Sequence, residues 1–204
     1  DTDRSRGLGD VYKRQWLDCS EIEECDLYCS RQAEEKIREK IKPYGIHGIH
    51  FLDSGNYHYV TEIMTSQIQK EFQLVVFDHH TDMQKPMIEH MTSCGDWAEK
   101  VLETNPWLQQ LVLIGPQAKD IEQLYRENDG LMNRKEISEK LLTFSAEEIH
   151  TREDKNKISK IKKNLPVYIS IDKDILDKQY TETNWSQGNM SLPMLERLLS
   201  HFLE

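Results

Sequence analysis

The apolar positions along the chain follow two different repeats in alternation. Short, mostly apolar runs, typical of strands that are buried on both faces, lie at residues 46–52, 74–77, 111–114, 141–144 and 167–171. The three- and four-residue spacing of amphipathic helices appears at residues 19–44, 60–72, 97–102, 121–125, 154–163 (a basic segment) and 191–202. This order predicts an α/β fold with a mainly parallel sheet that helices cover on both faces.

Composition and charge restrict the class of partner. The chain has 204 residues, of which 37% are hydrophobic, and this is enough for one sizeable core. No apolar run is long enough to cross a bilayer, so we expect no membrane partner. The net charge of −10 disfavours binding to nucleic acid phosphates and favours cations, metallic or organic. We therefore expect a small-molecule substrate, with a cationic one among the options.

The cysteines do not form a recognisable framework. Cys19, Cys25, Cys29 and Cys94 lack both the spacing of a thiolate metal site and the density of a secreted disulfide scaffold. We interpret them as reduced thiols of a cytoplasmic protein. Assembly into a homo-oligomer stays open at this point.

The two ends of the chain are unusual. Residues 1–15 (DTDRSRGLGDVYKRQ) have scattered charges and no apolar core of a secretory signal, and they resemble translated sequencing-adapter tails. We expect them to be a non-native or disordered tail that precedes a single α/β domain over residues 16–204. The last segment, SLPMLERLLSHFLE, stops without a helix cap, which predicts that the domain is incomplete at its C-terminus.

Acidic residues and a histidine follow the predicted strand 74–77. Ligands of parallel sheets bind at the carboxyl ends of the strands. Asp78, His80 and Asp82 alternate there, so an extended backbone would point all three side chains the same way. Two carboxylates and one imidazole suit Mn²⁺, Fe²⁺ or Zn²⁺ better than Ca²⁺. The alternative is a loop whose charges are simply solvated.

Two further strand ends carry similar chemistry. Asp172 and Asp174 alternate after the strand 167–171, and carboxylates that close repel each other unless a cation or a proton is shared. A surface turn is the alternative there. His58 begins the helix after the strand 46–52, where a lone histidine would be structural. Together the six side chains can hold two divalent ions, with a hydroxide between them as the nucleophile of a hydrolysis.

Three segments resemble a known family. GNYHYVT, FDHHTDMQ and SIDKDILD, in that order, resemble the metal-binding motifs of the ureohydrolases, the family of arginase, agmatinase and formiminoglutamase. SGNYHY, DHHTDMQ, SCGDW and NWSQGNMS are similar to bacterial proteins known only as arginase family proteins. The resemblance implies a three-layer α/β/α sandwich with a mainly parallel sheet, truncated in this chain, and two Mn²⁺ ions. It assigns one ion to His58, Asp78, Asp82 and Asp172 and the other to Asp78, His80, Asp172 and Asp174.

The resemblance also implies roles for individual residues. The expected activity is hydrolysis of a linear C–N bond in a guanidino, amidino or amide substrate, with Asp82 and Asp174 as catalytic carboxylates. Asp82 would accept a hydrogen bond from the bridging hydroxide and orient its attack. Asp177 would contact substrate or cap a turn, and Cys94 is a candidate substrate contact, although a space-filling thiol is the simpler interpretation. By strand alternation His79 points away and would make a structural hydrogen bond.

The chain departs from the family pattern in its loops. Residues 55–57 replace the usual glycine pair and aspartate before the first histidine, residues 92–96 stand where a proton-shuttling histidine is expected, and residues 184–188 replace a Gly-Thr-Gly-Thr-Pro stretch. These departures leave open a non-catalytic, metal-binding protein of the same fold. A DHH-type manganese phosphoesterase is less favoured. In that family a DxD motif precedes the DHH motif, whereas in this chain Asp172-Lys173-Asp174 follows Asp78-His79-His80.

Overall fold

The computed structural model describes residues 15–151 and 155–203. Its main sheet has four parallel strands in the order β5 (Leu141–Phe144), β4 (Leu108–Ile114), β2 (Phe72–Phe77) and β6 (Val167–Ile171). A separate antiparallel pair consists of β1 (Tyr28–Ser30) and β3 (Met91–Ser93). Most of the tail predicted over residues 1–15 lies outside the described residues, so both the tail and the boundaries of the domain stay predictions.

Helices fill the connections between the strands, as a parallel sheet requires. The α-helices are α1 (Arg31–Ile41), α2 (Val60–Thr65), α3 (Trp97–Thr104), α4 (Ala118–Glu127), α5 (Asp129–Met132), α6 (Lys135–Ser138), α7 (Ala146–Thr151), α8 (Lys155–Ile158) and α9 (Leu192–Leu203). The 3₁₀ helices η2 (Gly55–Tyr57) and η3 (Lys173–Ile175) are short. Among the residues with a described structure, no helix combines the length and the apolar character that a membrane crossing needs.

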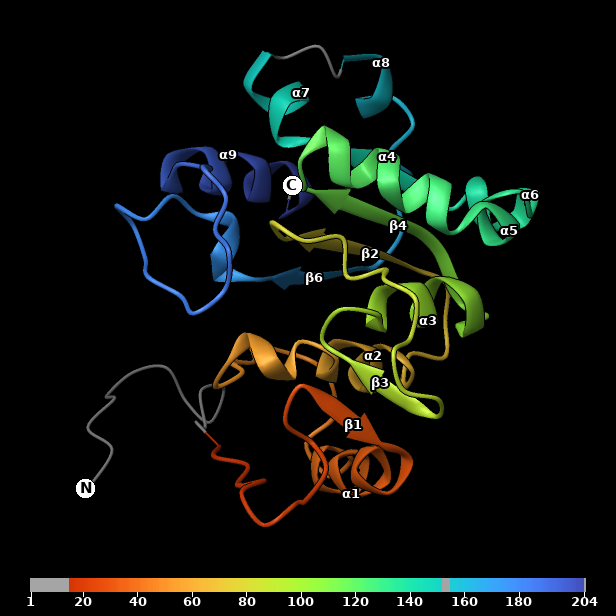
Figure 1. Ribbon diagram of the computed structural model, residues 1–204, viewed down its shortest axis with the longest axis vertical. Coiled ribbons are helices and arrows are strands. Elements are labelled where there is room, and N and C mark those ends of the chain that lie inside the picture. The colour runs from red at the N-terminus through yellow and green to blue at the C-terminus, as the bar shows by residue number, and fades with distance from the viewer. Residues whose placement is uncertain (1–14, 152–154, 204) are drawn as a thin grey trace.

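The sheet separates two hydrophobic cores. Successive side chains of a strand point to opposite faces, and in β2 Leu74 and Val76 join the core formed with α1, α2 and α3. Val75 and Phe77 join the other core, with α7 and α9. Figure 1 shows α1 and α2 below the strands and α7 and α9 above them. The predicted α/β fold, a parallel sheet between two helical layers, is therefore confirmed.

The first helix is shorter than predicted. A helix over residues 19–44 is wrong before Arg31, because Glu24 and Leu27 have φ angles of 56° and 63° that no right-handed helix allows. The helix begins instead at Arg31, and Ser30 caps it, because its Oγ accepts a hydrogen bond from the backbone N–H of Ala33 at 3.2 Å.

Other predicted boundaries also changed. The strand over residues 46–52 is wrong: the segment pairs with no strand in the described chain, and Ile49 and Phe51 are 86% and 92% exposed. Gly45 and Gly48 have positive φ angles there, which interrupt the extended backbone. The helix over 60–72 ends after α2, because Phe72 already belongs to β2. Of the basic helix over 154–163 only α8 formed, and Asp154 lies outside the described residues.

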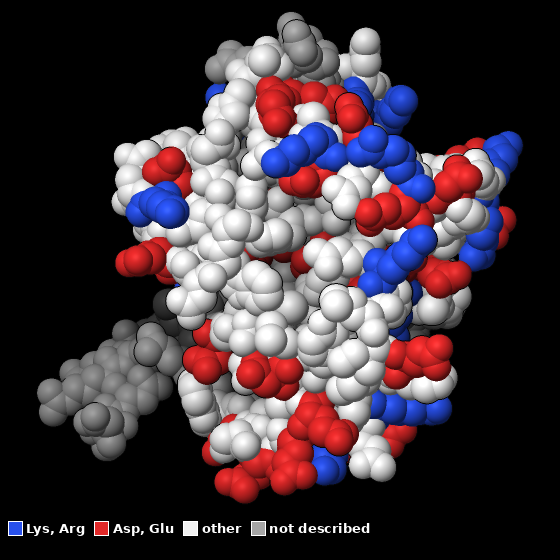
Figure 2. Space-filling view, viewed as in Figure 1, with Lys and Arg blue, Asp and Glu red and all other residues white. Residues whose placement is uncertain are grey.

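The surface agrees with the excess of acidic residues. Figure 2 shows Asp and Glu side chains gathered over the lower part of the molecule, around α1, while Lys and Arg are interspersed with acidic side chains over the upper part. The side in view therefore carries no broad basic surface of the kind that grips a phosphate backbone.

A glycine at the end of β4 allows the strands to approach each other closely. Gly115 has φ +119°, and a Cβ there would lie 2.5 Å from the carbonyl oxygen of Asp78 and 2.6 Å from Cδ1 of Ile175. We expect Gly115→Ala to cost about 1–3 kcal/mol through backbone strain and overlap, and hence about 2–4 °C of Tm per kcal/mol. Thermal denaturation measures this. Gly130→Ala is the control, because a Cβ at Gly130 would meet no atom of the described residues within 4 Å; an equal loss there would contradict the explanation.

The carboxyl group of Glu99 should make the stability of the fold depend on pH. Its Oε2 is buried and has no hydrogen-bond partner among residues 15–151 and 155–203, and burial, with the charges of Glu103 and Asp96, raises its pKa to about 7. Since this pKa lies above that of the unfolded chain, Glu99 makes the fold progressively less stable as the pH rises from about 4.5 to about 7, and the loss is complete above about pH 7. Glu99→Gln should raise Tm by about 2–4 °C at pH 8, and the gain should shrink as the pH falls towards about 4.5. Glu122→Gln, on the exposed face of α4, should change nothing; a lower Tm of Glu99→Gln at pH 8 would refute the prediction.

Candidate metal centre

The carboxyl ends of β2 and β6 place two aspartates side by side. Asp78 directly follows β2 and Asp172 directly follows β6, and the backbone N–H of Asp172 donates to the carbonyl of Phe77 at 2.8 Å. The backbone N–H of Asp78 donates to the carbonyl of Ile114 at the end of β4, at 3.1 Å. The parallel register of the strands therefore brings together carboxylates that are far apart in sequence.

His58 lies against one part of this cluster. Its Nδ1 is 3.1 Å from Oδ2 of Asp78, 3.0 Å from Oδ2 of Asp82 and 3.6 Å from Oδ2 of Asp172. His58, Asp78 and Asp82 offer ligand atoms within 4.8 Å of one another, and all three are buried. We call these three residues the first ligand group. The 3₁₀ helix η2 directly precedes His58 and helix α2 follows it, and these two elements position its imidazole in place of the predicted strand over residues 46–52.

A second set of ligands lies on the other side of Asp78. Nδ1 of His80 is 2.9 Å from Oδ2 of Asp174 and 3.4 Å from Oδ1 of Asp78. Asp78, His80 and Asp174 also offer ligand atoms within 4.8 Å of one another, and we call them the second ligand group. Asp78 belongs to both groups. Asp172 is placed between them, because its Oδ1 accepts the backbone N–H of Asp174 at 3.0 Å while its Oδ2 faces His58.

The charges in the cluster interact strongly. Burial opposes ionisation of Asp78, but hydrogen bonds from His58 and His80 outweigh it and lower its pKa. Burial raises the pKa of Asp82 to about 7, and the neighbouring charge of Asp78 adds to this effect. Burial, with the charges of Asp78 and Asp172, raises the pKa of Asp174 to about 6. The two histidines therefore stabilise the charge of Asp78, whereas the charges of Asp82 and Asp174 are not fully compensated.

The histidines respond in the opposite sense. Burial disfavours protonation of His58, but hydrogen bonds with Asp78 and Asp82 outweigh it and raise its pKa well above the usual value. His80 behaves in the same way through Asp174 and Asp78, and its pKa rises to about 10. In the described part of the chain no lysine or arginine forms an ion pair with these aspartates. Carboxylate oxygens and imidazole nitrogens without a basic partner fit divalent transition ions.

Two serines hold the imidazoles from behind. Nε2 of His58 lies 2.9 Å from Oγ of Ser170, and Nε2 of His80 lies 2.7 Å from Oγ of Ser186. Such contacts fix the orientation of a histidine ligand and leave Nδ1 to face the cluster. Sequence reasoning missed both serines. Ser170 could have been found, since it lies two residues before Asp172 on the same face of β6, whereas Ser186 depends on the path of a loop.

Glycine is needed where η2 approaches the cluster. A Cβ at Gly55 would lie 3.1 Å from Oδ2 of Asp172 and 3.3 Å from the Trp185 indole. The residues that replace the family's usual sequence before His58 thus still bring the backbone close to a carboxylate.

The remaining candidates have less direct relations to the cluster. Burial raises the pKa of the Cys94 thiol to about 12, with Asp82 adding to it, so this thiol stays protonated. Oδ1 of Asp177 accepts the backbone N–H of Gln179 at 2.9 Å, which is the turn-capping alternative. Contact of Cys94 or Asp177 with substrate stays a prediction. The prediction that His79 makes a structural hydrogen bond is wrong for its Nδ1 atom, because this atom is buried and has no partner among the described residues. The imidazole of His79 instead lines a cavity together with His150.

Comparisons with known proteins relate this chain to one protein by sequence and to another by fold. The chain is 31% identical over 154 residues to an uncharacterised protein of Thermotoga maritima, covering 76% of this chain and 52% of that protein. The crystal structure of formimidoylglutamase from Bacillus subtilis is similar in fold, with a TM-score of 0.58 and 12% identity, over 84% of this chain and 55% of that one. The chain thus spans about half the length of the relatives that it matches.

The family itself follows from a match over most of the chain. A sequence profile of the arginase family matches residues 10–183, a range that contains His58, both aspartate pairs and the strands that carry them. Together with the parallel sheet and the two ligand groups at its carboxyl edge, this match shows that the chain belongs to the arginase family.

Proposed function

We propose that this chain carries the binuclear metal centre of a hydrolase that cleaves linear C–N bonds, with Mn²⁺ as the metal. The observation that supports the proposal best is that two ligand groups of mixed carboxylate and imidazole donors share one buried carboxylate, Asp78. A shared ligand is the arrangement that two-metal hydrolytic sites need.

Each ion has a set of residues that fits it. His58, Asp78 and Asp82 would hold one ion, and His80, Asp78 and Asp174 the other. Asp172, next to His58 and Asp174, would bridge the two together with Asp78. When bound, the two ions supply a water activated near neutral pH and a positive charge that polarises the electrophilic carbon.

The chain's own groups position the reactants. Asp82 would accept a hydrogen bond from the attacking water and fix its direction, and Asp174 would hold the opposite side of the site. The Trp185 ring lies beside His80, with centroids 6.0 Å apart, and is partly exposed. An aromatic face at that position favours a cationic group such as a guanidinium or an amidinium.

One observation favours a second candidate, a metal-binding protein without catalytic activity. Residues 92–96 provide no histidine where the family pattern has a proton shuttle, and the protonated Cys94 thiol is a poor replacement for it. The match to the arginase family, in contrast, disfavours the DHH-type phosphoesterase.

Metal binding provides the first test. The chain should bind two Mn²⁺ ions, and Mn²⁺ at about 100 times the Kd of each site should stabilise it by about 2.7 kcal/mol per ion, or about 5.4 kcal/mol in all, a Tm rise of about 10–20 °C. Asp78→Asn should lose both ions and the rise in Tm, because both ligand groups share Asp78. Elemental analysis and thermal denaturation measure these effects. Asp129→Asn, an exposed carboxylate on α5, should behave as the wild type; full metal content in Asp78→Asn would refute the shared site.

Turnover provides the second test. The manganese-loaded chain should release urea, ammonia or an amine from at least one compound in a panel of guanidines, amidines and linear amides, since water adds to the carbon and nitrogen leaves. Asp82→Asn and Asp174→Asn should each lose about 100-fold or more of the rate, whereas Asp129→Asn should lose none. Two bound ions without turnover of any compound would support the non-catalytic candidate, and cleavage of a phosphodiester alone would support the phosphoesterase.

A further inference from the structure

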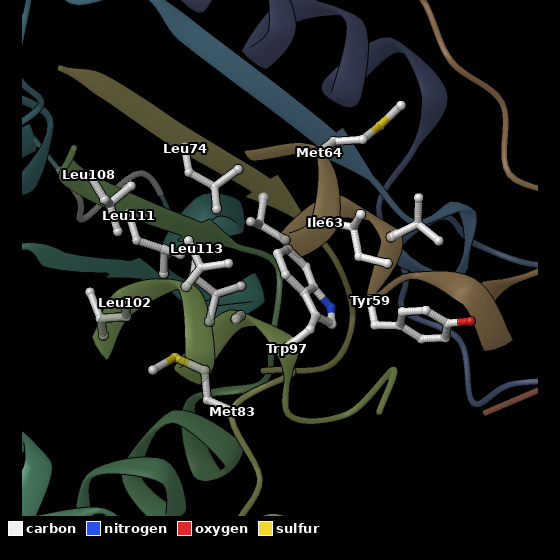
Figure 3. Packing of buried hydrophobic residues seen from close by; sticks show 14 of the residues in the cluster. Tyr59, Ile63, Met64, Leu74, Met83, Trp97, Leu102, Leu108, Leu111 and Leu113 are labelled. Atoms are coloured by element: carbon white, nitrogen blue, oxygen red, sulfur yellow. The ribbon is translucent and has the colours of Figure 1, made fainter. Parts of the chain in front are cut away.

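A buried tryptophan contacts the first ligand group. Trp97, the first residue of α3, is fully buried in the core on one side of the sheet. Figure 3 shows its indole among Leu113, Ile63 and Tyr59. A buried indole N–H needs a hydrogen-bond acceptor, and in an apolar core such acceptors are rare.

The acceptor is a metal-ligand carboxylate. Nε1 of Trp97 donates to Oδ2 of Asp82 at 2.6 Å, and both side chains are buried. Oδ2 is also the oxygen that lies 3.0 Å from Nδ1 of His58. The indole ring contacts the His58 imidazole as well, with centroids 4.7 Å apart and planes tilted by 49°. One side chain thus contacts two members of the first ligand group.

The same helix also fixes the backbone of Asp82. The carbonyl of Asp82 accepts the backbone N–H of Ala98 at 3.0 Å. Asp82 has φ +50°, a left-handed conformation that is costly for a residue with a side chain and persists only where its surroundings impose it. The start of α3 therefore holds both the main chain and the carboxylate of Asp82.

Helix α3 is itself firmly anchored. Nζ of Lys100 donates to Glu34 of α1 at 3.0 Å, to Glu62 of α2 at 3.2 Å and to Thr92 of β3 at 2.9 Å. These contacts connect three neighbouring elements to α3 one turn after Trp97. The indole therefore presents its N–H from a support that the surrounding elements keep in position.

We propose that Trp97 is a positioning residue, which holds Oδ2 of Asp82 in the orientation that binds the first of the two ions. The proposal rests on the proposed function, since it assumes a metal at the first ligand group. A carboxylate oxygen can accept the indole N–H with one lone pair and bind an ion with another. Without this donor the Asp82 carboxylate is free to rotate. Loss of such an outer contact typically costs about 10–100-fold in metal affinity.

The effect should be confined to one ion. Of the candidate ligands, Trp97 contacts Asp82 and His58, whereas His80 and Asp174 of the second ligand group are supported by Ser186 and by each other. A residue that matters only for packing would weaken the whole fold and both ions together. A positioning residue would separate the two affinities.

The test is a calorimetric Mn²⁺ titration of the full chain that resolves two binding constants. Trp97→Phe, which keeps an aromatic ring but removes the N–H, should weaken one constant by about 10–100-fold and leave the other nearly unchanged. Trp107→Phe is the matched control and should titrate as the wild type, because Trp107 is 41% exposed and directly precedes β4, at the end of the strand opposite to the ligand groups. Circular dichroism of the metal-free variants shows whether each is folded.

A second variant separates the hydrogen bond from packing. Replacing the Trp97 indole with the isosteric benzothiophene ring, by incorporation of benzothienylalanine, keeps the shape and removes only the donor. It should reproduce the weakened constant of Trp97→Phe. Wild-type affinity for both ions in the benzothiophene variant, or equal weakening of both ions, would overturn the role of Trp97 while leaving the metal centre intact. A wild-type chain that binds no Mn²⁺ would overturn the proposed function and this role with it.

Discussion

The sharing of the Asp78 carboxylate between two imidazoles is the interaction on which the rest of the site depends. A buried carboxylate is costly unless charged or hydrogen-bonding partners surround it. Asp78 lies at the end of the central strand β2, between the ends of β4 and β6, and His58 and His80 approach it from opposite sides. His58 also contacts Asp82, and His80 also contacts Asp174. One buried carboxylate therefore belongs to two ligand groups.

The sequence predicted the strand ends well, because the relevant signals are local. The buried run before Asp78 and the alternation after it pointed to Asp78, His80 and Asp82 as candidate ligands, and the structure places all three in the two ligand groups. Alternation alone, however, predicted that the side chains of Asp78, His80 and Asp82 point the same way. In the structure they do not: His80 faces Asp174, and Asp82 faces His58. The φ angle of +50° at Asp82 breaks the extended geometry that the argument assumed. Only the family resemblance implied the division into two groups.

Other features could not be predicted because they depend on distant neighbours. An apolar run becomes a strand only where another backbone pairs with it, and the exposed Ile49 and Phe51 lie in a run that has no such neighbour within the described residues. The contact of Ser186 with His80 spans 106 positions and follows from the path of a loop. The bond between Trp97 and Asp82 spans only 15 positions, but it requires the chain to turn sharply between them.

The two halves of the site rest on different kinds of support. The first ligand group is buried, and the helices α2 and α3 of the packed core hold it. In the second group the His80 side chain is 28% exposed, and the loop that follows β6 contacts it through Ser186 and Trp185. Core contacts tolerate little change, whereas exposed loops vary readily. The loop over residues 184–188 can therefore depart from the family pattern while the first group keeps its geometry.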